Sequence, residues 1–528
     1  MPPHPVLIDG RWRPANSSGV FRADNPTTGE PLPDEFPVST WADCDAALDA
    51  AVRAHEVLTK LPVETIAAFL EDYAGRIEGD AEQLVATAHA ETGLPAPTRL
   101  AQIELPRTIN QLRLAAAAAR ARSWSQPTID TKLNIRSQFA SIGPVWVFGP
   151  NNFPFAFGSI SGGDFAAAIA AGNPVIAKAN TSHPGTTRLL AELAQAAADA
   201  ADLPPGTVQL LYRTSHADGA RLVADPRTGA TGYTGSRQAG LTLKAAADQA
   251  GKPIYLELSS VNPVFLLPGA LAERGDKLAE EFTGSCLMGT GQFCTNPGFV
   301  VLLAGADTER FIAAVTERFQ AAPADVLLSR GVLKSLGEGV QTLRAAGAAV
   351  LAGGQPAEGP GFRYANTLLR TTAAKFLAQP AALQTEAFGN ASLFVVAESA
   401  DEADALIDHL EGSLTGCFYS ATSGADEALY ARLAPRLRPR VGRLLNDKMP
   451  TGVAVSPAMN HGGPYPATGH PGFTAVGIPA ALHRFARLEC YDNVRAERLP
   501  EALRNKNPGG VWRLVDGAWT TADVASPS

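Results

Sequence analysis

Apolar residues recur at helical spacing through the first part of the chain. Three amphipathic helices are predicted over residues 43–58, 61–77 and 80–91, and a longer one, rich in alanine and leucine, over 99–124. Near-alternation of apolar and polar residues over 125–142 then predicts an exposed β-hairpin. This change of period marks a domain boundary.

From Gly143 onward, short apolar runs alternate with helical patterns. The predicted strands are 144–148, 174–178, 208–212, 229–233, 254–258 and 263–267, and the predicted helices are 163–171, 187–201, 217–224, 236–249 and 308–320. Such alternation is typical of parallel sheets with helices on both faces, so the sequence predicts the α/β class. The chain is expected to be extended again from about residue 482 and frayed over 524–528.

Composition narrows the class of protein. A chain of 528 residues predicts about three to four domains, and 45% hydrophobic residues against 18% charged ones exclude disorder as the main state. A net charge of -8 argues against a dedicated nucleic-acid binder. The sequence lacks a signal-peptide pattern and a run of about 20 apolar residues, so we expect a cytoplasmic protein without a membrane or nucleic-acid partner.

The cysteines are too few and too scattered to form a disulfide framework. Cys294 lies between glycines in the segment GTGQFCTNPG at 289–298, where a thiol is either a nucleophile or a buried small side chain. The other four cysteines lie in helical or strand-like contexts and are interpreted as structural; they are Cys44, Cys286, Cys417 and Cys490. No metal site is expected.

Two further polar residues attract attention. Asn152 lies in a proline-rich turn, where asparagine is commonly a turn residue. Glu257 lies in an otherwise apolar strand, and a buried carboxylate must be paired, neutralised or functional. No G-x-G-x-x-G motif follows a strand, so a conventional dinucleotide fingerprint is absent.

Six segments together resemble the aldehyde dehydrogenase superfamily over essentially the whole chain. They are 143–157, 172–185, 232–240, 255–271, 291–298 and 386–393, in matching order and spacing. Segments 450–468 and 504–517 resemble a narrower group, the 2,5-dioxovalerate (α-ketoglutaric semialdehyde) dehydrogenases and the related NADP-dependent fatty-aldehyde dehydrogenases. The implied architecture is a Rossmann-like cofactor domain (1–121 and 143–256), an α/β catalytic domain (257–481) and a bridging β-sheet for oligomerisation (122–142 and 482–528).

The resemblance implies the chemistry. Cys294 would attack the aldehyde and form a thiohemiacetal, whose oxyanion the Asn152 amide and the Cys294 backbone N–H would receive. Glu257 would be the general base for hydrolysis of the resulting thioester, with a pKa raised by apolar neighbours. The overall reaction would convert an aldehyde, NAD(P)+ and water into a carboxylate.

The same resemblance implies a nicotinamide cofactor. Lys178 and Glu386 would hold its two riboses, Phe388 would pack near the nicotinamide ribose, and Phe148 would also contact the cofactor. Ser236 opens a helix whose N-terminus would face the pyrophosphate.

Two residues predict the form of that cofactor. Thr181 stands where NAD-preferring relatives usually carry a glutamate, and Arg213 follows the next strand, where its guanidinium could pair with a 2′-phosphate. We therefore expect NADP, with NAD as the other candidate. A solvated loop arginine is the alternative interpretation of Arg213.

The substrate is less well defined by the sequence. The expected channel residues are Phe157, Ile160, Phe293 and Thr295, with segment 455–457. Relatives that act on dioxovalerate usually carry Cys-His where this chain has Ser456-Pro457, and E-V-F-G-P is altered to E-A-F-G-N at 386–390. We expect 2,5-dioxovalerate or a similar semialdehyde as the substrate.

Three alternatives are open. Long-chain or aromatic aldehydes would need an apolar channel, whereas a dicarboxylate product calls for an arginine or lysine near its mouth, which the pattern does not locate. A branch that transfers the acyl group to coenzyme A would not need Glu257. A catalytically silent member would have lost Cys294 or Glu257.

Exposed edges of the bridging strands predict a homodimer or homotetramer.

Overall fold

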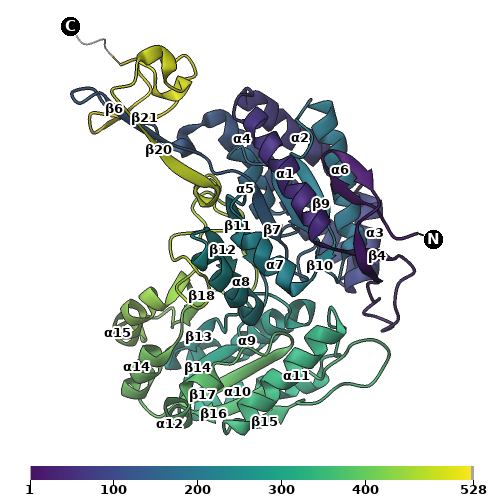
Figure 1. Cartoon of the computed structure of the whole chain (residues 1–528). Coiled ribbons are helices and arrows are strands. Elements are labelled where there is room, and N and C mark those ends of the chain that lie inside the picture. The colour runs from purple at the N-terminus through teal and green to yellow at the C-terminus, as the bar shows by residue number, and fades with distance from the viewer. Residues whose placement is uncertain (1, 525–528) are drawn as a thin grey trace.

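The computed structural model describes residues 2–524. Figure 1 shows two helix-covered lobes and a smaller sheet that projects from one end. No helix in the described part of the chain combines the length and the apolar character that a membrane crossing requires.

The first lobe is built on a seven-stranded sheet with the order β12-β11-β7-β8-β9-β1-β2. Its strands are β1 (Val6–Ile8), β2 (Arg11–Arg13), β7 (Val145–Phe148), β8 (Val175–Lys178), β9 (Val208–Leu211), β11 (Ala230–Thr234) and β12 (Ile254–Glu257). The strands from β12 to β9 are parallel, whereas β1 and β2 add antiparallel at the edge. The central strands are almost wholly buried because helices cover both faces.

The helices of this lobe are α1 (Trp41–Leu58), α2 (Val63–Gly79), α3 (Ala81–Thr92), α4 (Leu105–Ala121), α5 (Gly163–Ala170), α6 (Pro184–Ala200), α7 (His216–Ala224) and α8 (Arg237–Gln249). A small sheet of β3 (Ser17–Phe21), β4 (Phe36–Ser39) and β10 (Arg213–Thr214) lies beside them.

The long helix expected over 99–124 is two helices of different winding. Residues Ala96–Glu104 form a π-helix, η1, and α4 begins at Leu105. Pro106 has no backbone N–H, so it cannot supply one of the hydrogen bonds of an unbroken α-helix, and the change of winding falls beside it. The periodicity located the helical region but not this change.

The second lobe contains a seven-stranded sheet with the order β15-β16-β17-β14-β13-β18-β19. Its strands are β13 (Pro263–Leu266), β14 (Phe299–Leu303), β15 (Ala349–Ala352), β16 (Thr367–Thr372), β17 (Ala391–Ala397), β18 (Ser413–Tyr419) and β19 (Val441–Asn446), and only β15 is antiparallel to its neighbour. Its helices are α9 (Pro268–Leu287), α10 (Ala306–Ala321), α11 (Arg330–Ala345), α12 (Ala373–Ala378), α13 (Pro380–Leu383), α14 (Ala400–His409) and α15 (Glu427–Leu437).

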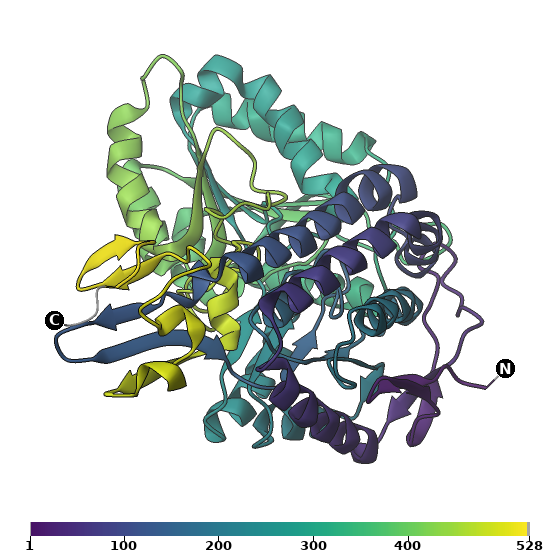
Figure 2. The same cartoon turned by 90° about the horizontal axis from the view of Figure 1, so that it is seen from above.

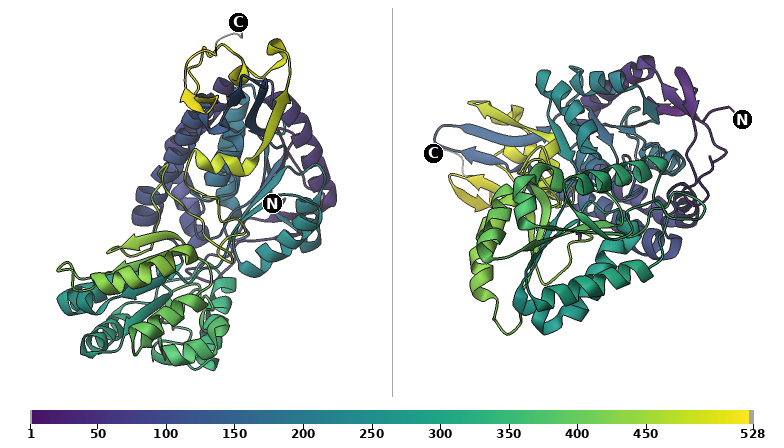
Figure 3. Two further views of the ribbon diagram at one scale, coloured as in Figure 1. Left: turned by 90° about the vertical axis from the view of Figure 1, so that its left-hand side faces the viewer. Right: turned by 90° about the horizontal axis from the view of Figure 1, so that it is seen from below.

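The projecting sheet joins segments far apart in the sequence, as Figures 2 and 3 show. Its order is β20-β6-β5-β21-β22, formed by β5 (Thr128–Asp130), β6 (Ile135–Ser141), β20 (Ala486–Asp492), β21 (Arg513–Val515) and β22 (Ala518–Thr520). The hairpin expected over 125–142 is confirmed as β5 and β6. Strand β20 is an edge and exposes Leu488. Of the end expected to fray, 525–528 lies outside the described residues.

Candidate active site

The carboxyl ends of the parallel strands in the first lobe carry several predicted site residues. Phe148 ends β7, Lys178 ends β8 and Glu257 ends β12. Ligands of open parallel sheets bind at this edge. A cavity of about 250 Å³ lies there, and its lining includes Asn152, Ser236, Glu257, Cys294, Glu386 and Phe388.

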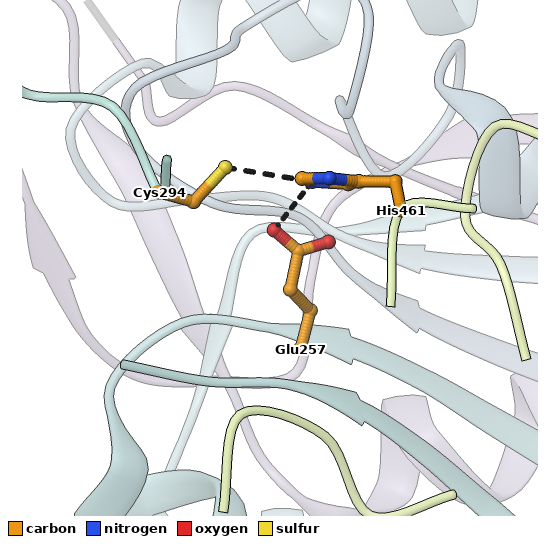
Figure 4. A group of neighbouring side chains, drawn as sticks. All are labelled: Glu257, Cys294 and His461. Atoms are coloured by element: carbon orange, nitrogen blue, oxygen red, sulfur yellow. Dashed lines mark hydrogen bonds and ion pairs between the residues drawn. The ribbon is translucent and has the colours of Figure 1, made fainter. Parts of the chain in front are cut away.

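Two residues of the cavity lining, Cys294 and Glu257, share a neighbour, His461, and Figure 4 shows the three side chains. Nε2 of His461 lies 3.4 Å from Sγ of Cys294 and 2.9 Å from Oε1 of Glu257. His461 and Glu257 are buried, and Cys294 is half-buried. The imidazole therefore contacts both the predicted nucleophile and the predicted base through one ring nitrogen.

His461 was not among the residues predicted from the sequence. It lies 167 positions from Cys294 and 204 from Glu257, so no local spacing links the three. The available signal was its position inside segment 450–468, which supported the narrower resemblance. Its backbone N–H donates to Oγ1 of Thr474, and its carbonyl accepts from the N–H of Ala475, which fixes the backbone beneath the ring.

The pKa values of the thiol and the carboxyl group move in opposite directions. Burial and the nearby Glu257 carboxylate raise the pKa of Cys294 well above its usual value. Burial alone would raise the pKa of Glu257. The charge and hydrogen bond of His461, the hydrogen bond of Cys294 and the charge of Arg484 together outweigh burial, so that the pKa is lowered. The expectation of a raised pKa for Glu257 is wrong, because its neighbours include a basic ring and not only apolar groups.

The loop that carries Cys294 is fixed by hydrogen bonds and by close packing. Asn262 donates through Nδ2 to the carbonyl oxygens of Cys294 and Asn296, each at 2.9 Å. Gly291 has φ +66°, and a Cβ there would lie 2.1 Å from the carbonyl oxygen of Gly389. Only glycine fits at this contact between the nucleophile loop and the loop that follows Glu386.

Asn152 is hydrogen-bonded to the nucleophile loop. Its Nδ2 atom donates to the carbonyl oxygen of Gln292 at 2.9 Å, and the residue is only 5% exposed. The amide is therefore held beside the residues that precede Cys294 and borders the cavity. Its role as an oxyanion donor stays a prediction.

A buried ion pair holds the loop that contains Asn152 through hydrogen bonds to its backbone. Arg99 in η1 pairs with Glu104 at 2.6 Å, and their side chains are 7% and 0% exposed. Glu104 also accepts from the backbone N–H groups of Phe155 and Ala156, while Arg99 donates to the carbonyl oxygen of Asn152 at 3.2 Å. The π-helix thus anchors the loop that presents Asn152.

The cavity has features that fit a dinucleotide. Ser236 is the N-cap of α8 but makes no side-chain capping bond, so the first-turn N–H groups are open to a phosphate beside the cavity. Glu386 accepts from the N–H of Ser260 at 3.2 Å, and burial raises its pKa. Phe388 lines the same cavity.

The other predicted cofactor residues lie outside this lining. Burial and then the charge of Arg213 lower the pKa of Lys178 to about 8, so these two basic residues are neighbours. Arg213 is exposed and Thr181 half-buried. Phe148 packs against Tyr233, with ring centroids 6.2 Å apart.

The predicted channel residues separate into two groups. Phe157 and Phe293 join Phe153 in a buried aromatic cluster beside the nucleophile loop. Thr295 is buried and accepts from the N–H of Gly452 at 3.0 Å. Ile160 is fully buried in the main core cluster, and its place in the channel stays a prediction.

The donor atoms of Glu257, Cys294 and His461 all lie within 4.8 Å of one another, which is close enough to hold a metal ion. Sulfur, imidazole and carboxylate are ligands that zinc accepts. The absence of a metal stays a prediction.

The aldehyde dehydrogenase family model matches residues 12–463. The chain is 40% identical over 524 residues to alpha-ketoglutaric semialdehyde dehydrogenase 2 of Azospirillum brasilense, an alignment that covers 97% of this chain and 98% of that protein. It is 35% identical over 528 residues to the alpha-ketoglutaric semialdehyde dehydrogenase of Acinetobacter baylyi, with the same coverage of 97% and 98%.

Solved structures share the fold at lower sequence identity. An aldehyde dehydrogenase from Bacillus cereus in complex with NAD+ aligns with a TM-score of 0.79 at 18% identity, over 93% of this chain and 96% of that one. The 1-pyrroline-5-carboxylate dehydrogenase of Thermus thermophilus aligns with a TM-score of 0.79 at 22% identity, over 92% of each chain. The predicted fold class and superfamily are confirmed. The chain belongs to the aldehyde dehydrogenase family and is an oxidoreductase.

Proposed function

We propose that this enzyme oxidises a short aldehyde that carries a carboxylate, 2,5-dioxovalerate or a similar semialdehyde, to the corresponding acid with NADP+. The observation that supports the mechanism best is the chain of Cys294, His461 and Glu257 at the cavity. The two full-length relatives named as α-ketoglutaric semialdehyde dehydrogenases support the class of substrate.

Catalysis begins with the Cys294 thiol, which loses its proton and forms a carbon–sulfur bond with the aldehyde carbon. His461 lies within reach of this proton and can carry it away from the sulfur to solvent, which leaves the Glu257 carboxylate ionised for the later step. The Asn152 amide and the Cys294 backbone N–H stabilise the oxyanion of the thiohemiacetal.

The nicotinamide, when bound, supplies the hydride acceptor that lets the thiohemiacetal become a thioester. Glu257 then takes a proton from water as the water attacks the thioester, and the Cys294 sulfur leaves. A carboxylate whose pKa is lowered is ionised at neutral pH, as a general base must be.

The cofactor groups are assigned by chemistry and position. The open N-terminus of α8 would hold the pyrophosphate, and Glu386 and Lys178 the riboses. Thr181 is uncharged, whereas a glutamate at this position would repel a 2′-phosphate. Arg213 places a positive charge near Lys178. These features favour NADP over NAD.

The assembly and the domain roles belong to the same proposal. Residues 1–121 and 143–256 would bind the cofactor, 257–481 would carry the nucleophile, and 122–142 with 482–528 would form the bridging segments. The exposed edge of β20 favours a homodimer or homotetramer. We propose that the enzyme works in the cytoplasm.

Steady-state reduction of NADP+ by the purified enzyme tests this proposal. We expect a clearly higher kcat/KM for 2,5-dioxovalerate than for hexanal or benzaldehyde, and a higher kcat/KM for NADP+ than for NAD+. A higher kcat/KM for hexanal or benzaldehyde would keep the chemistry and replace the semialdehyde by an apolar substrate.

A further inference from the structure

Arg107, in the first turn of α4, lies beside the aromatic cluster at the nucleophile. Its guanidinium carbon is 5.1 Å from the ring centre of Phe157 and 6.0 Å from that of Phe153. A positive charge in such a setting is unfavourable unless it has a partner. No role was predicted for this arginine from the sequence.

Two hydrogen bonds fix the orientation of the guanidinium. Nε donates to Oε1 of Gln111 at 3.2 Å, and Nη1 donates to the carbonyl oxygen of Val453 at 2.5 Å. Gln111 is fully buried and is itself held by the carbonyl oxygen of Ala156. These two hydrogen bonds therefore preorganise Arg107 before any substrate binds.

The remaining nitrogen of the guanidinium has no acceptor. Nη2 of Arg107 is buried, and no residue of the described chain, 2–524, accepts a hydrogen bond from it. An unsatisfied buried N–H of a charged group is strongly unfavourable, so a ligand that supplies an acceptor there gains affinity.

The guanidinium also acts on the nucleophile. Burial and Glu257 raise the pKa of Cys294, and the positive charge of Arg107 opposes that rise. Arg107 is thus within electrostatic reach of the reacting sulfur, on the side of the aromatic cluster that contains Phe157 and Phe293.

We propose that Arg107 is the binding subsite for the carboxylate at the far end of the substrate, an inference that rests on the proposed semialdehyde function. The carboxylate accepts hydrogen bonds from Nη2 while the aldehyde carbon meets Cys294. Because Nη2 is buried, side chains around it have to shift for the carboxylate to reach it. An alkyl aldehyde leaves Nη2 unsatisfied, which discriminates against apolar substrates.

A purely structural role for Arg107 is the competing explanation, since Nη1 holds Val453. The same segment already has another anchor, because Nη2 of Arg443 donates to the carbonyl oxygens of Pro450 and Gly452 at 3.1 and 3.0 Å. A purely structural role would account for the hydrogen bond from Nη1 to Val453 but not for the buried Nη2 atom that has no acceptor.

The test compares 5-oxopentanoate with pentanal, which have the same chain length and differ in a carboxylate against a methyl group. The variants are Arg107→Gln and Arg107→Lys. Arg113→Gln is the matched control, since Arg113 lies on the same helix but is half-exposed and pairs with Glu78. The measured quantity is kcat/KM for each aldehyde with saturating NADP+.

We expect Arg107→Gln to lower kcat/KM for 5-oxopentanoate by roughly 10- to 100-fold, mainly through KM, because a charge-assisted hydrogen bond is lost. The value for pentanal should fall much less, by the part that the lost charge near Cys294 takes from both aldehydes. Arg107→Lys, which keeps the charge, should recover part of the loss, and Arg113→Gln should match the wild type.

Equal losses on both aldehydes would overturn the subsite and assign Arg107 a structural role. An unchanged ratio in Arg107→Gln would overturn it as well. If the wild-type enzyme itself prefers pentanal, the proposed semialdehyde function fails, and the subsite fails with it. The wild-type ratio therefore separates a failure of the function from a failure of the residue assignment.

Discussion

Nε2 of His461 lies 2.9 Å from Oε1 of Glu257, so the predicted general base is paired with a buried imidazole. The same nitrogen lies 3.4 Å from the Cys294 sulfur. One ring thus contacts both the thiol that loses a proton and the carboxylate that takes one from water. His461 comes from a segment that follows both of these residues in the chain.

Replacing His461 by Gln should lower kcat and shift its pH dependence. Without the charge of the imidazole, burial dominates and the pKa of Glu257 rises, so more of the base is protonated at neutral pH. We expect kcat to fall by about 10²-fold at pH 7 and its acid limb to move to higher pH. His409→Gln, an exposed histidine on α14, is the control. A reduced kcat with an unmoved pH profile would make His461 a packing residue only.

Replacing Glu257 by Gln should make the Cys294 thiol more reactive in the cofactor-free enzyme. The carboxylate raises the pKa of the thiol, so its removal lowers that pKa and increases the thiolate fraction at a given pH. Labelling by iodoacetamide at pH 8 should become faster. Cys490→Ser should be present throughout, because Cys490 is exposed. Slower labelling than in the Cys490→Ser parent would contradict this electrostatic relationship.

Replacing Arg99 by Met should destabilise the cofactor lobe. Glu104 would then be a buried carboxylate without its cation, which typically lowers the free energy of unfolding by about 3–5 kcal/mol. The double variant Arg99→Met with Glu104→Gln should recover much of the loss, because no lone charge is left. Thermal unfolding measures both. An Arg99→Met protein as stable as the wild type would show that the pair contributes little.

The cofactor preference should depend on Arg213. Arg213→Ala should raise KM for NADP+ with little effect on KM for NAD+, because only the former carries a 2′-phosphate. Thr181→Glu should lower the NADP+ to NAD+ ratio of kcat/KM further, through repulsion of that phosphate. Equal effects on the two cofactors, or a native preference for NAD+, would refute the assignment.

The parallel strands of the first lobe could be predicted because their patterns are local. The strands that end at Phe148, Lys178 and Glu257 are short apolar runs next to turn residues, and their shared edge follows from a parallel arrangement. The winding of 96–104 could not be predicted, because a π-helix has no separate signature in apolar spacing.

The site was only partly predictable. The positions of Cys294 and Glu257 came from the resemblance, whereas His461 and Arg107 reach the site only through folding, from 167 and 187 positions away from the nucleophile. Ile160 lies in the main core cluster, so its place in the channel stays a prediction that apolar character alone cannot decide. Whether a residue lies at the site or in the core depends on contacts between segments that are distant in the sequence.

Acyl-enzyme trapping tests the central claim most directly. Glu257→Gln is mixed with 2,5-dioxovalerate and NADP+, and the protein is quenched and analysed by peptide mass spectrometry. If Cys294 is the nucleophile and Glu257 the base, reduced nicotinamide forms in a burst of one equivalent per active site, and the acyl group is found on the peptide that contains Cys294. Continuous turnover without an adduct, or an adduct on another residue, would contradict the account.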